Sequence, residues 1–324
     1  MQAVILAAGK STRTYPLTLT KPKPLLKAAN KTLLEHNLDG LNGIVNEALI
    51  VVGYKKDLIK KYFGSRYKNI KLRYAGQKKQ MGTGNALLAA EKYIKNDFIS
   101  LHGDDIYSKE DFRNILKNKY AVLVKKVKNP GNFGIVIQNN GVLTNLIEKP
   151  EIFISDLANT GLYKLDRKIF GVIKKLKKSK RGEYELTDAI RDLSKKEKIH
   201  CVKSKQWLPI GYPSNLLKAD KILRKNKNVI GRNSKISGKV KNSSIGDNCI
   251  VKGDVKNSIV MDNAVIDRNS LAENSIIGEN VHLNGRAFNA IIADKSIIMN
   301  SNLVKCKIWP NRSISGKTIT QDVN

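Results

Sequence analysis

The residues best suited to chemistry lie within the first twenty-five positions of the chain. Ala7, Ala8 and Gly9 follow an apolar run and have almost no side chain. An anion can therefore lie against the backbone N–H groups of this loop, as phosphates do in backbone nests and at helix starts. Arg13 and Lys23 supply positive charge to the same stretch. The pattern indicates a loop that binds the phosphates of a ligand.

The stretch from residue 6 to residue 25 resembles the signature of sugar-1-phosphate nucleotidylyltransferases, LAAGxGTRxxPLTxxxPKPL, in order and spacing. Ser11 departs from it, because that family usually has glycine there. A Walker loop would need Gly-Lys-Ser/Thr after a longer glycine-bounded loop, and a dinucleotide fingerprint would need three spaced glycines. The resemblance implies a catalytic role for Arg13 and Lys23. It implies nucleotide binding by Leu6, Ala7, Ala8 and Gly9.

Length and composition favour a soluble globular protein of two domains, with 324 residues of which 41% are hydrophobic. No apolar run approaches the roughly 18 to 20 residues of a membrane span, and the N-terminal run is too short for a signal peptide. We therefore expect a cytoplasmic protein without a membrane partner. Cys201, Cys249 and Cys306 lie far apart without CxxC spacing, which favours reduced structural thiols over a metal site or a disulfide framework.

The formal net charge of +31 raises nucleic-acid or acidic-membrane binding as a hypothesis. The cations are mostly lysines scattered along helical stretches such as residues 174–178 and 194–198. Aromatic residues make up 6% of the chain and form no cluster on which bases could stack. Dispersed lysine is typical of a proteome-wide compositional bias, so nucleic acid is not an expected partner.

Residues 1 to about 225 alternate short apolar runs with helical patterns. The expected strands are Val4–Ala7, Glu47–Val52, Ile70–Tyr74, Phe98–His102 and Ala121–Lys125. The expected helices are Leu33–Leu41, Lys55–Phe63, Asn85–Ile94 and Asp111–Lys117. This alternation predicts an α/β fold with a doubly wound, mainly parallel, Rossmann-like sheet, whose ligands sit at the carboxyl ends of the strands. The Gly9 loop and the Gly103-Asp104 pair each follow a strand, so we expect both to face one cleft.

From about Val229 the sequence changes to Ile- or Val-centred units of about six residues. Asparagines recur at positions 242, 257, 274 and 289, at intervals of 15, 17 and 15. So short a period indicates a solenoid and resembles the hexapeptide-repeat left-handed β-helix, here with about five coils. An all-β sandwich is the alternative, but it would lack a fixed period. We expect the nucleotidyltransferase domain at residues 1–228 and the C-terminal β-helix at residues 229–324.

Nucleotidyl transfer needs a metal on the triphosphate but no protein base, because the attacking sugar phosphate is already anionic. Asp104 suits Mg²⁺ as an oxygen ligand and matches the Gly-Asp motif of the family, in which Gly103 lies beside the nucleotide. We expect Asp105 to be an exposed neighbour. Many relatives carry a second metal-binding aspartate in Trp-x-Asp-Ile-Gly, where this chain has Pro209. Three alternatives remain for the metal in this chain. Asp104 holds the ion together with substrate phosphates and water, or a neighbouring residue replaces the second aspartate as a ligand. In the third alternative, metal affinity and transferase activity are reduced.

The stretch from Gln77 to Ala86 resembles the base-recognition loop of the family, which opens a helix. The Gln77 amide can bond a pyrimidine edge, while Gly82 and Thr83 bring the backbone close to the base. An ordinary glycine-capped helix start is the alternative. In the family, Ala-Ala-Gly in the first loop together with Gly-Thr-Gly here goes with uridylyl transfer, which favours UTP.

Three further motifs match the sugar side of these enzymes in order: residues 133–136, 147–150 and 159–163. The resemblance assigns sugar-phosphate binding to Gly134, Glu148, Lys149, Asn159 and Thr160. Glu148 can accept hydrogen bonds from sugar hydroxyls, Lys149 can reach the phosphate, and Asn159 can bond a hydroxyl or an N-acetyl group. The stretch at 181–188 also matches the family, although its Thr187 and Asp188 equally suit a helix start.

Taken together, the resemblance implies Mg²⁺-dependent transfer of UMP from a nucleoside triphosphate, UTP, to a sugar 1-phosphate, with N-acetylglucosamine 1-phosphate favoured. Glucose 1-phosphate with uridylyl or thymidylyl transfer, and mannose 1-phosphate with guanylyl transfer, remain alternatives. A weakly active regulatory subunit that binds nucleotide sugars is another alternative, motivated by Ser11 and Pro209.

The β-helix of bifunctional relatives also acetylates glucosamine 1-phosphate, and such a bifunctional enzyme is a further alternative. Residues 278–285 resemble the start of that acetyltransferase region, but the Gly-Ala-Gly-Thr that follows it there is replaced by residues 286–289 here. Residues 307–311 resemble the closing segment of monofunctional enzymes. We expect His282 on a coil surface and the β-helix to drive a homo-oligomer such as a trimer.

Overall fold

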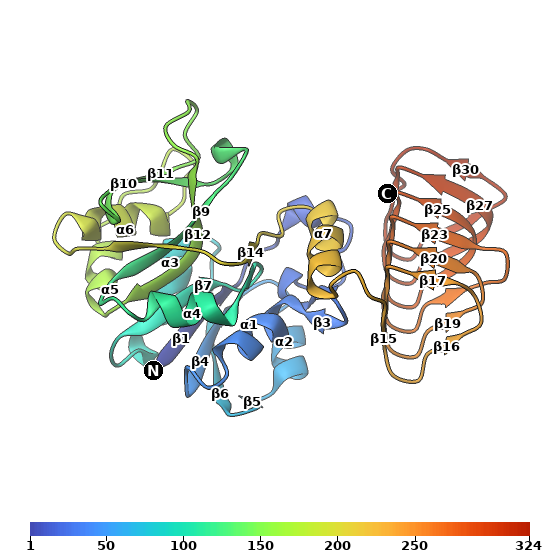
Figure 1. Ribbon diagram of the computed structural model, residues 1–324, viewed down its shortest axis with the longest axis horizontal. Coiled ribbons are helices and arrows are strands. Elements are labelled where there is room, and N and C mark those ends of the chain that lie inside the picture. Colours follow the sequence, from blue (N-terminus) through green and yellow to red (C-terminus); the bar gives the residue numbers. More distant parts are fainter. The chain divides into compact units, whose positions relative to one another are not determined.

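The computed structural model describes residues 1–324, which form two compact units (Figure 1). Unit 1 comprises Met1–Gly9 and Leu34–Pro209, and unit 2 comprises Lys10–Leu33 and Ile210–Asn324. The N-terminal signature therefore runs through both, because the Leu6–Gly9 loop belongs to unit 1 while Arg13 and Lys23 belong to unit 2. None of the helices combines the length and apolar character that crossing a bilayer needs.

Unit 1 is built on a ten-stranded sheet. In spatial order its strands are β10 (Gly134–Asn139), β11 (Val142–Glu148), β13 (His200–Lys203), β9 (Ala121–Lys126), β12 (Leu157–Leu165), β7 (Phe98–His102), β1 (Gln2–Ala7), β4 (Glu47–Val52), β6 (Ile70–Gly76) and β5 (Arg66–Tyr67). The neighbours β7, β1, β4 and β6 are mutually parallel. The apolar runs of β7, β1 and β4 are buried, as strands covered on both faces require, whereas β6 alternates buried and exposed residues. The α/β fold expected from the alternating pattern is confirmed.

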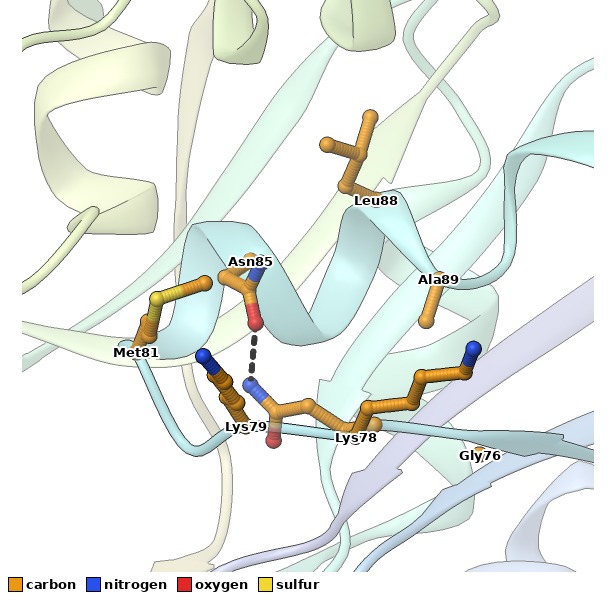
Figure 2. A pocket seen from close by; sticks show the side chains of 8 residues that line it. Gly76, Lys78, Lys79, Met81, Asn85, Leu88 and Ala89 are labelled. Carbon is orange, nitrogen blue, oxygen red and sulfur yellow. Dashed lines mark hydrogen bonds between the residues drawn. The ribbon is translucent and has the colours of Figure 1, made fainter.

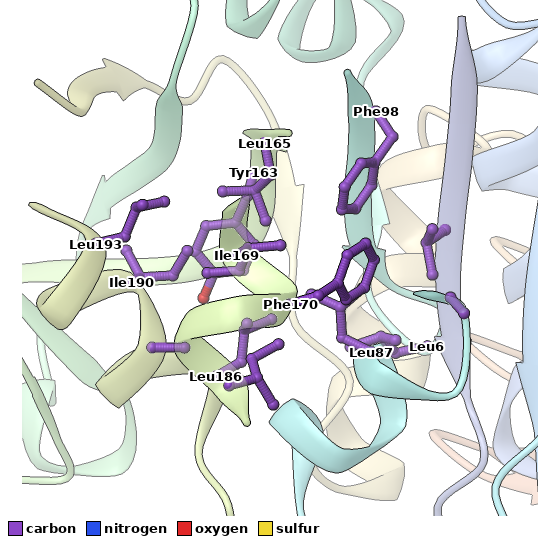
Figure 3. Close-up of a cluster of buried hydrophobic side chains, with 14 of the residues drawn as sticks. Leu6, Leu87, Phe98, Tyr163, Leu165, Ile169, Phe170, Leu186, Ile190 and Leu193 are labelled. Atoms are coloured by element: carbon purple, nitrogen blue, oxygen red, sulfur yellow. The ribbon is translucent and has the colours of Figure 1, made fainter. Parts of the chain in front are cut away.

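Helices cover this sheet and close its core. They are α1 (Leu33–Leu41), α2 (Lys56–Phe63), α3 (Thr83–Leu88), α4 (Lys109–Ile115), α5 (Lys168–Ile173) and α6 (Leu186–Ser194). Figure 3 shows side chains of α3, α5 and α6 packed against the strands. The rings of Phe98 and Phe170 stack there with centroids 5.7 Å apart. The helix expected at 85–94 is shorter than predicted, because after Leu88 the backbone tightens into a 3₁₀ turn at Glu91–Tyr93.

Unit 2 contains the predicted left-handed β-helix, preceded by α7 (Pro213–Leu223). One face stacks six parallel strands: β15 (Val229–Ile230), β18 (Ser244–Ile245), β21 (Ile259–Val260), β24 (Ile276–Ile277), β26 (Ile291–Ile292) and β28 (Lys307–Ile308). The other strands are β16 (Lys235–Ile236), β17 (Val240–Lys241), β19 (Ile250–Val251), β20 (Asp254–Lys256), β22 (Val265–Ile266), β23 (Leu271–Glu273), β25 (His282–Phe288), β27 (Ile297–Val304), β29 (Ser313–Ser315) and β30 (Thr318–Ile319). Fully buried aliphatic side chains fill the interior.

The asparagine repeat marks corners of these coils. Asn242, Asn257, Asn274 and Asn289 all adopt left-handed backbone conformations, with φ between 48° and 50°. Asparagine tolerates this region better than other non-glycine residues, because its short polar side chain can bond locally. The period seen in the sequence is therefore a period of backbone turns, and the aliphatic residues between the turns supply the core.

Unit 2 also holds the segment Lys10–Leu33, which follows the Gly9 loop. It includes the 3₁₀ turns Thr12–Thr14 and Lys23–Leu25, and a short antiparallel hairpin of β2 (Lys27–Ala28) and β3 (Lys31–Thr32). We refer to these residues, 10–33, as the signature segment. It carries both cations to which the sequence assigns a catalytic role.

Candidate active site

The loops after the central strands of unit 1 are hydrogen-bonded to one another at the carboxyl edge of the sheet. The amide of Gly103 donates to the carbonyl of Leu6 at 2.9 Å, and that of Tyr54 donates to the carbonyl of Ala8 at 3.0 Å. The side-chain amide of Gln80 donates to the same Ala8 carbonyl at 2.8 Å. From β1 the chain runs to β4 and β6 and then returns to β7 on the other side of β1. Ligands of open α/β sheets bind at such a switch point.

Two glycines allow these loops to approach so closely. A Cβ at Gly103 would lie 2.9 Å from Cγ2 of Ile5, and a Cβ at Gly53 would lie 2.7 Å from the carbonyl oxygen of Ala8. Only glycine fits either position without moving backbone or core atoms. The predicted nucleotide residues Leu6, Ala8 and Gly103 are thus brought together.

Ser11 occupies a left-handed conformation with φ 54°. Glycine adopts this region at little cost, which accounts for its use at this position in the signature. Here two buried hydroxyls hold the strained turn, since Thr14 Oγ1 donates to the Ser11 carbonyl at 2.6 Å and Thr18 Oγ1 at 3.0 Å. Ser11 therefore replaces the glycine of the signature while the turn keeps the left-handed backbone that glycine would adopt.

The two predicted catalytic cations differ in their surroundings. The Arg13 guanidinium lies 5.6 Å from the ring centroid of Tyr212, a cation–π contact within unit 2. Lys23 begins the 3₁₀ turn of the signature segment and is 5% exposed. A lysine this buried is uncommon in proteins, which fits a specialised role for it.

The predicted base-recognition residue Gln77 is held in a fixed orientation. Its Nε2 donates to Oδ1 of Asn85 at 2.9 Å (Figure 2). It also donates to the carbonyl of Gly82 at 3.2 Å. The amide oxygen is left to accept from a ligand. Gly82 has φ 99°, and a Cβ there would lie 2.7 Å from the carbonyl oxygen of Tyr184. Thr83 begins α3, and its hydroxyl accepts from the amide of Leu186 at 3.0 Å.

A cavity of about 350 Å³ adjoins this loop (Figure 2). Its lining consists of Gly76, Gln77, Lys78, Lys79, Met81, Asn85, Leu88 and Ala89. Apolar atoms of α3 form one side of it and two lysines frame the other, a combination suited to a flat ring that carries or adjoins negative charge.

The sugar-side residues converge on the backbone of Gly134. This glycine is paired with Glu148 across β10 and β11. A Cβ there would lie 3.0 Å from Oε2 of Glu148, 3.1 Å from Cγ2 of Thr187 and 3.6 Å from Nδ2 of Asn159. We call these four residues the sugar cluster.

Asn159 is oriented by its own strand. Its Nδ2 donates to the Tyr163 hydroxyl at 2.6 Å and its Oδ1 accepts from the amide of Gly161 at 3.0 Å. The pairing of β12 with β9 is irregular between Asn159 and Tyr163, where Gly161 has φ 80°. Such irregularities re-aim side chains next to functional sites. The Thr160 hydroxyl, by contrast, donates a hydrogen bond to the carbonyl of Leu123 at 3.0 Å.

Charged groups surround the sugar cluster. Arg181 Nη1 lies 3.6 Å from Oε1 of Glu148 and 3.2 Å from Oε1 of Glu185. Burial raises the pKa of the Glu185 carboxyl, the Glu148 charge raises it further, and Arg181 opposes both effects. Lys149 extends to 4.0 Å from Oε1 of Glu148 and is about one-third exposed.

The sequence matched residues 181–188 to the family but assigned them no contact with the sugar-side residues. The hydroxyl of Thr187 is buried without a hydrogen-bond partner and does not cap α6, whose first amide instead bonds Thr83. The part of Thr187 that faces Gly134 is its methyl carbon Cγ2, which would lie 3.1 Å from a Cβ at that glycine. The signal in the sequence was the charged run before the helix start.

The candidate metal ligand Asp104 follows β7 and is half-buried. The expectation that Asp105 is exposed is wrong, because its carboxylate is buried and accepts from Trp207 Nε1 at 3.0 Å. Trp207 belongs to β14 (Trp207–Leu208), which pairs with β8 (Ile106–Tyr107). Pro209 directly follows β14 and offers no side-chain oxygen. The residues fit a Mg²⁺ that takes one carboxylate and completes its shell with substrate phosphates and water, as is usual for this ion.

His282 lies on β25 with its side chain 40% exposed, and its Nε2 is 2.7 Å from Oδ2 of Asp267. Asn284 Nδ2 donates to the same oxygen at 3.4 Å. The histidine is therefore at the coil surface and has a carboxylate that orients its ring.

Comparison with known proteins identifies the family. Residues 2–226 match the nucleotidyl transferase family, and the chain belongs to it. Over 227 residues it is 43% identical to the bifunctional protein GlmU of Methanocaldococcus jannaschii, a match that covers 69% of this chain and 54% of that protein. It is 36% identical to the UTP–glucose-1-phosphate uridylyltransferase AglF of Haloferax volcanii, across 69% of this chain and 97% of that one.

The comparison with solved structures finds the same fold in a related enzyme. A UDP-glucose pyrophosphorylase in complex with UDP-glucose superposes with a TM-score of 0.63 at 25% identity, covering 70% of this chain and 99% of that chain. The match to GlmU proteins is partial on their side, since this chain spans little more than half of the length of the first curated relatives it matches.

Proposed function

We propose that the protein transfers a uridylyl group from UTP to a sugar 1-phosphate, with N-acetylglucosamine 1-phosphate the favoured acceptor. The observation that carries this proposal is the sugar cluster, in which the side chains of Glu148, Asn159 and Thr187 surround the backbone of Gly134, in a chain of the nucleotidyl transferase family. The reaction joins a phosphate oxygen of the sugar 1-phosphate to the α-phosphorus of UTP. The bond from that phosphorus to the bridging oxygen breaks, and diphosphate leaves with the electron pair.

The chemistry needs positive charge at the transferring phosphoryl group more than it needs a base. Arg13 and Lys23 are proposed to stabilise charge that develops on the α-phosphate and on the leaving diphosphate. Mg²⁺ would neutralise triphosphate charge when bound, with Asp104 as its protein ligand. The amides of the Ala7–Gly9 loop would hold the nucleotide phosphates.

The amide oxygen of Gln77 is compatible with a uracil base. Because its amide hydrogens are already donated, Gln77 can only accept, and it suits a ring N–H such as N3–H of uracil or thymine. Guanine offers a ring N–H as well, and the amino groups of cytosine and adenine are also donors, so this contact admits uracil without excluding the other bases. The printed name of the AglF relative, a UTP-dependent enzyme, supports uracil.

The acceptor preference is drawn from the sugar cluster. Glu148 would accept from sugar hydroxyls, Lys149 would reach the phosphate, and Asn159 would bond a hydroxyl or an N-acetyl group. The resemblance of the sequence motifs to those of N-acetylglucosamine-1-phosphate uridylyltransferases favours the amino sugar, whereas the printed name of AglF supports glucose 1-phosphate as the second candidate.

The test is diphosphate release from the full chain with Mg²⁺, using five nucleoside triphosphates against the 1-phosphates of N-acetylglucosamine, glucose and mannose. We expect the highest kcat/KM for UTP with N-acetylglucosamine 1-phosphate. A preference for glucose 1-phosphate would select the second candidate. No release from any pair, combined with measurable UDP-sugar binding by calorimetry, would favour a regulatory subunit instead.

We also propose that the domain boundary lies at residue 228 and that the β-helix at 229–324 assembles a homo-oligomer such as a trimer. Parallel coils with a regular surface are a common basis for symmetric assembly. Sedimentation of the full chain measures the stoichiometry, and a monomer at micromolar concentration would exclude this part of the proposal.

A further inference from the structure

Four carboxylates form a column along one corner of the β-helix. Asp247, Asp262, Glu279 and Asp294 each lie two residues after strand positions that pair with one another on successive coils. The two aspartates Asp262 and Asp294 divide their oxygens in the same way. Oδ1 accepts from a backbone amide one coil earlier, at 3.0 Å for Asp262 and 2.8 Å for Asp294. This leaves Oδ2 of each facing away from that bond.

Three of the four carboxylates in this column, Asp262, Glu279 and Asp294, contact the signature segment within unit 2, whereas Asp247 pairs with Arg232. Lys27 Nζ lies 2.5 Å from Oδ2 of Asp262. Lys21 Nζ lies 2.5 Å from Oε1 of Glu279 and 3.0 Å from Oδ2 of Asp294. The hydroxyl of Thr20 donates to the same Asp294 oxygen at 2.5 Å. Three coils of the β-helix are thus bound to a segment that precedes them by more than two hundred residues.

The ion pairs of Lys21 are buried, which makes them costly to break. Lys21 is 7% exposed and Asp294 is 5% exposed. The lysine ammonium meets its carboxylates at ion-pair distance, although not in hydrogen-bonding directions. Removing one partner of a buried ion pair leaves an uncompensated charge, which is strongly destabilising. We therefore expect the loss of Lys21 to weaken the attachment of the signature segment to the β-helix.

The far end of the signature segment is fixed as well. The amide of Ala29 donates to Oδ1 of Asp220 at 2.8 Å, and Asn30 Nδ2 donates to the carbonyl of Ile245 at 2.5 Å. Asp220 belongs to α7 and also accepts from Ser244 on the β-helix at 2.5 Å. Lys23 therefore lies between two attachment points of its own segment.

We propose that the carboxylate column holds the signature segment in the orientation that nucleotidyl transfer requires, with Lys21 and Lys27 as positioning residues that act through Lys23 and Arg13. This inference rests on the proposed function. It gives the β-helix a part in the transferase reaction itself, beyond assembly.

The test uses two measurements on the full chain: hydrogen exchange of the amides in residues 10–33, and steady-state kinetics with UTP and N-acetylglucosamine 1-phosphate. The variants are Lys21→Met, Lys27→Met and the charge swap Lys27→Asp with Asp262→Lys. The swap is placed at Lys27 because this pair is more exposed than the Lys21 pair and tolerates reversal better. Lys256→Met is the control, since it breaks a 2.7 Å pair with Glu273 on the same β-helix that does not involve the segment.

We expect faster exchange in residues 10–33 and a fall in kcat of about tenfold to a hundredfold for both methionine variants, the size that a misplacement of about 1 Å produces. KM for each substrate should stay within about twofold, because ground-state binding is retained. The charge swap should recover most of the exchange protection and most of the kcat that Lys27→Met loses. The Lys256→Met control should match the wild type in both measurements.

Unchanged exchange in the methionine variants would show that the docking does not exist and would overturn the proposal. Faster exchange with unchanged kcat would also overturn it, since the segment would then be docked without being positioned for catalysis. A wild type inactive on every substrate pair would refute the proposed function, while the exchange result would still decide whether the docking exists.

Discussion

A methyl group added at Gly134 tests the sugar cluster directly. Its carbon would lie 3.0 Å from the Glu148 carboxylate and 3.1 Å from the Thr187 methyl group. Both distances are tighter than nearly all real contacts of this kind, so the neighbours must give by a few tenths of an ångström. Glu148 is restrained by Arg181 at 3.6 Å, and Thr187 is fixed on α6. The added methyl group must therefore displace Glu148 or Thr187, and Glu148 is a residue that we propose to bind the sugar.

The size of the effect follows from these contacts. A methylene-sized misfit in a binding pocket is worth about 1–3 kcal/mol, or about 10–200-fold. We expect Gly134→Ala to raise KM for the sugar 1-phosphate at least about tenfold and to leave KM for UTP within about twofold. Overpacking also costs up to about 1–3 kcal/mol of folding free energy, so Tm should fall by several degrees.

The assay is diphosphate release with each substrate varied in turn, alongside thermal unfolding. Gly171→Ala on α5 is the control, because a Cβ there meets nothing within 4 Å. It should leave both KM values unchanged. An unaltered sugar KM in folded Gly134→Ala, or an equal rise for both substrates, would refute the placement of the sugar at this cluster.

Four further outcomes are expected. Lys23→Ala should lower kcat by about a hundredfold, since a lost transition-state charge contact costs about 2.7–4 kcal/mol, and unchanged kinetics would contradict its role. Asp104→Asn should abolish Mg²⁺-dependent activity with Tm retained, whereas Asp105→Asn should mainly lower Tm through the weakened bond to the tryptophan; the reverse pattern would mean that the wrong carboxylate was assigned. The full chain should not acetylate glucosamine 1-phosphate from acetyl-CoA, and acetylation that depends on His282 would make the protein bifunctional. Burial raises the pKa of the Glu185 carboxyl, so the native state binds that proton more tightly than the unfolded state does. The free energy of unfolding should therefore fall as pH rises from the ordinary glutamate range through the folded pKa. Glu185→Gln should flatten this pH dependence in unfolding measurements, and an identical slope would argue against the shift.

The central strands were the part of the fold that the sequence predicted best. Glu47–Val52 and Phe98–His102 are strands with those same bounds, because a parallel strand covered on both faces leaves an uninterrupted apolar run. The asparagine period likewise predicted the β-helix, since each coil needs a left-handed corner. The helix after Gly82 was harder to bound, because the change from α to 3₁₀ hydrogen bonding near Leu88 leaves no mark in the apolar pattern.

Long-range pairings were beyond such reasoning. Thr187 meets Gly134 only because β10, β11 and α6 pack together, and local periodicity does not encode that packing. Lys21 is one of 59 basic residues, and nothing in its immediate sequence distinguishes a buried ion pair from a solvated charge. The buried state of Asp105 was hidden for the same reason, since its partner Trp207 lies 102 residues away.

The discontinuity of unit 2 imposes an order on biosynthesis. Thr20 leaves the ribosome 274 residues before its partner Asp294, a delay of about 14–55 s at about 5–20 residues per second. Throughout that interval the strands of unit 1 can pair, while the lysines next to Thr20 have no carboxylates to meet. Thr20 and Lys21 of the nascent chain therefore lack their partner Asp294 until the coil that carries it emerges. Completion of the final coils, rather than closure of the central sheet, would then set the moment at which a newly made molecule becomes competent.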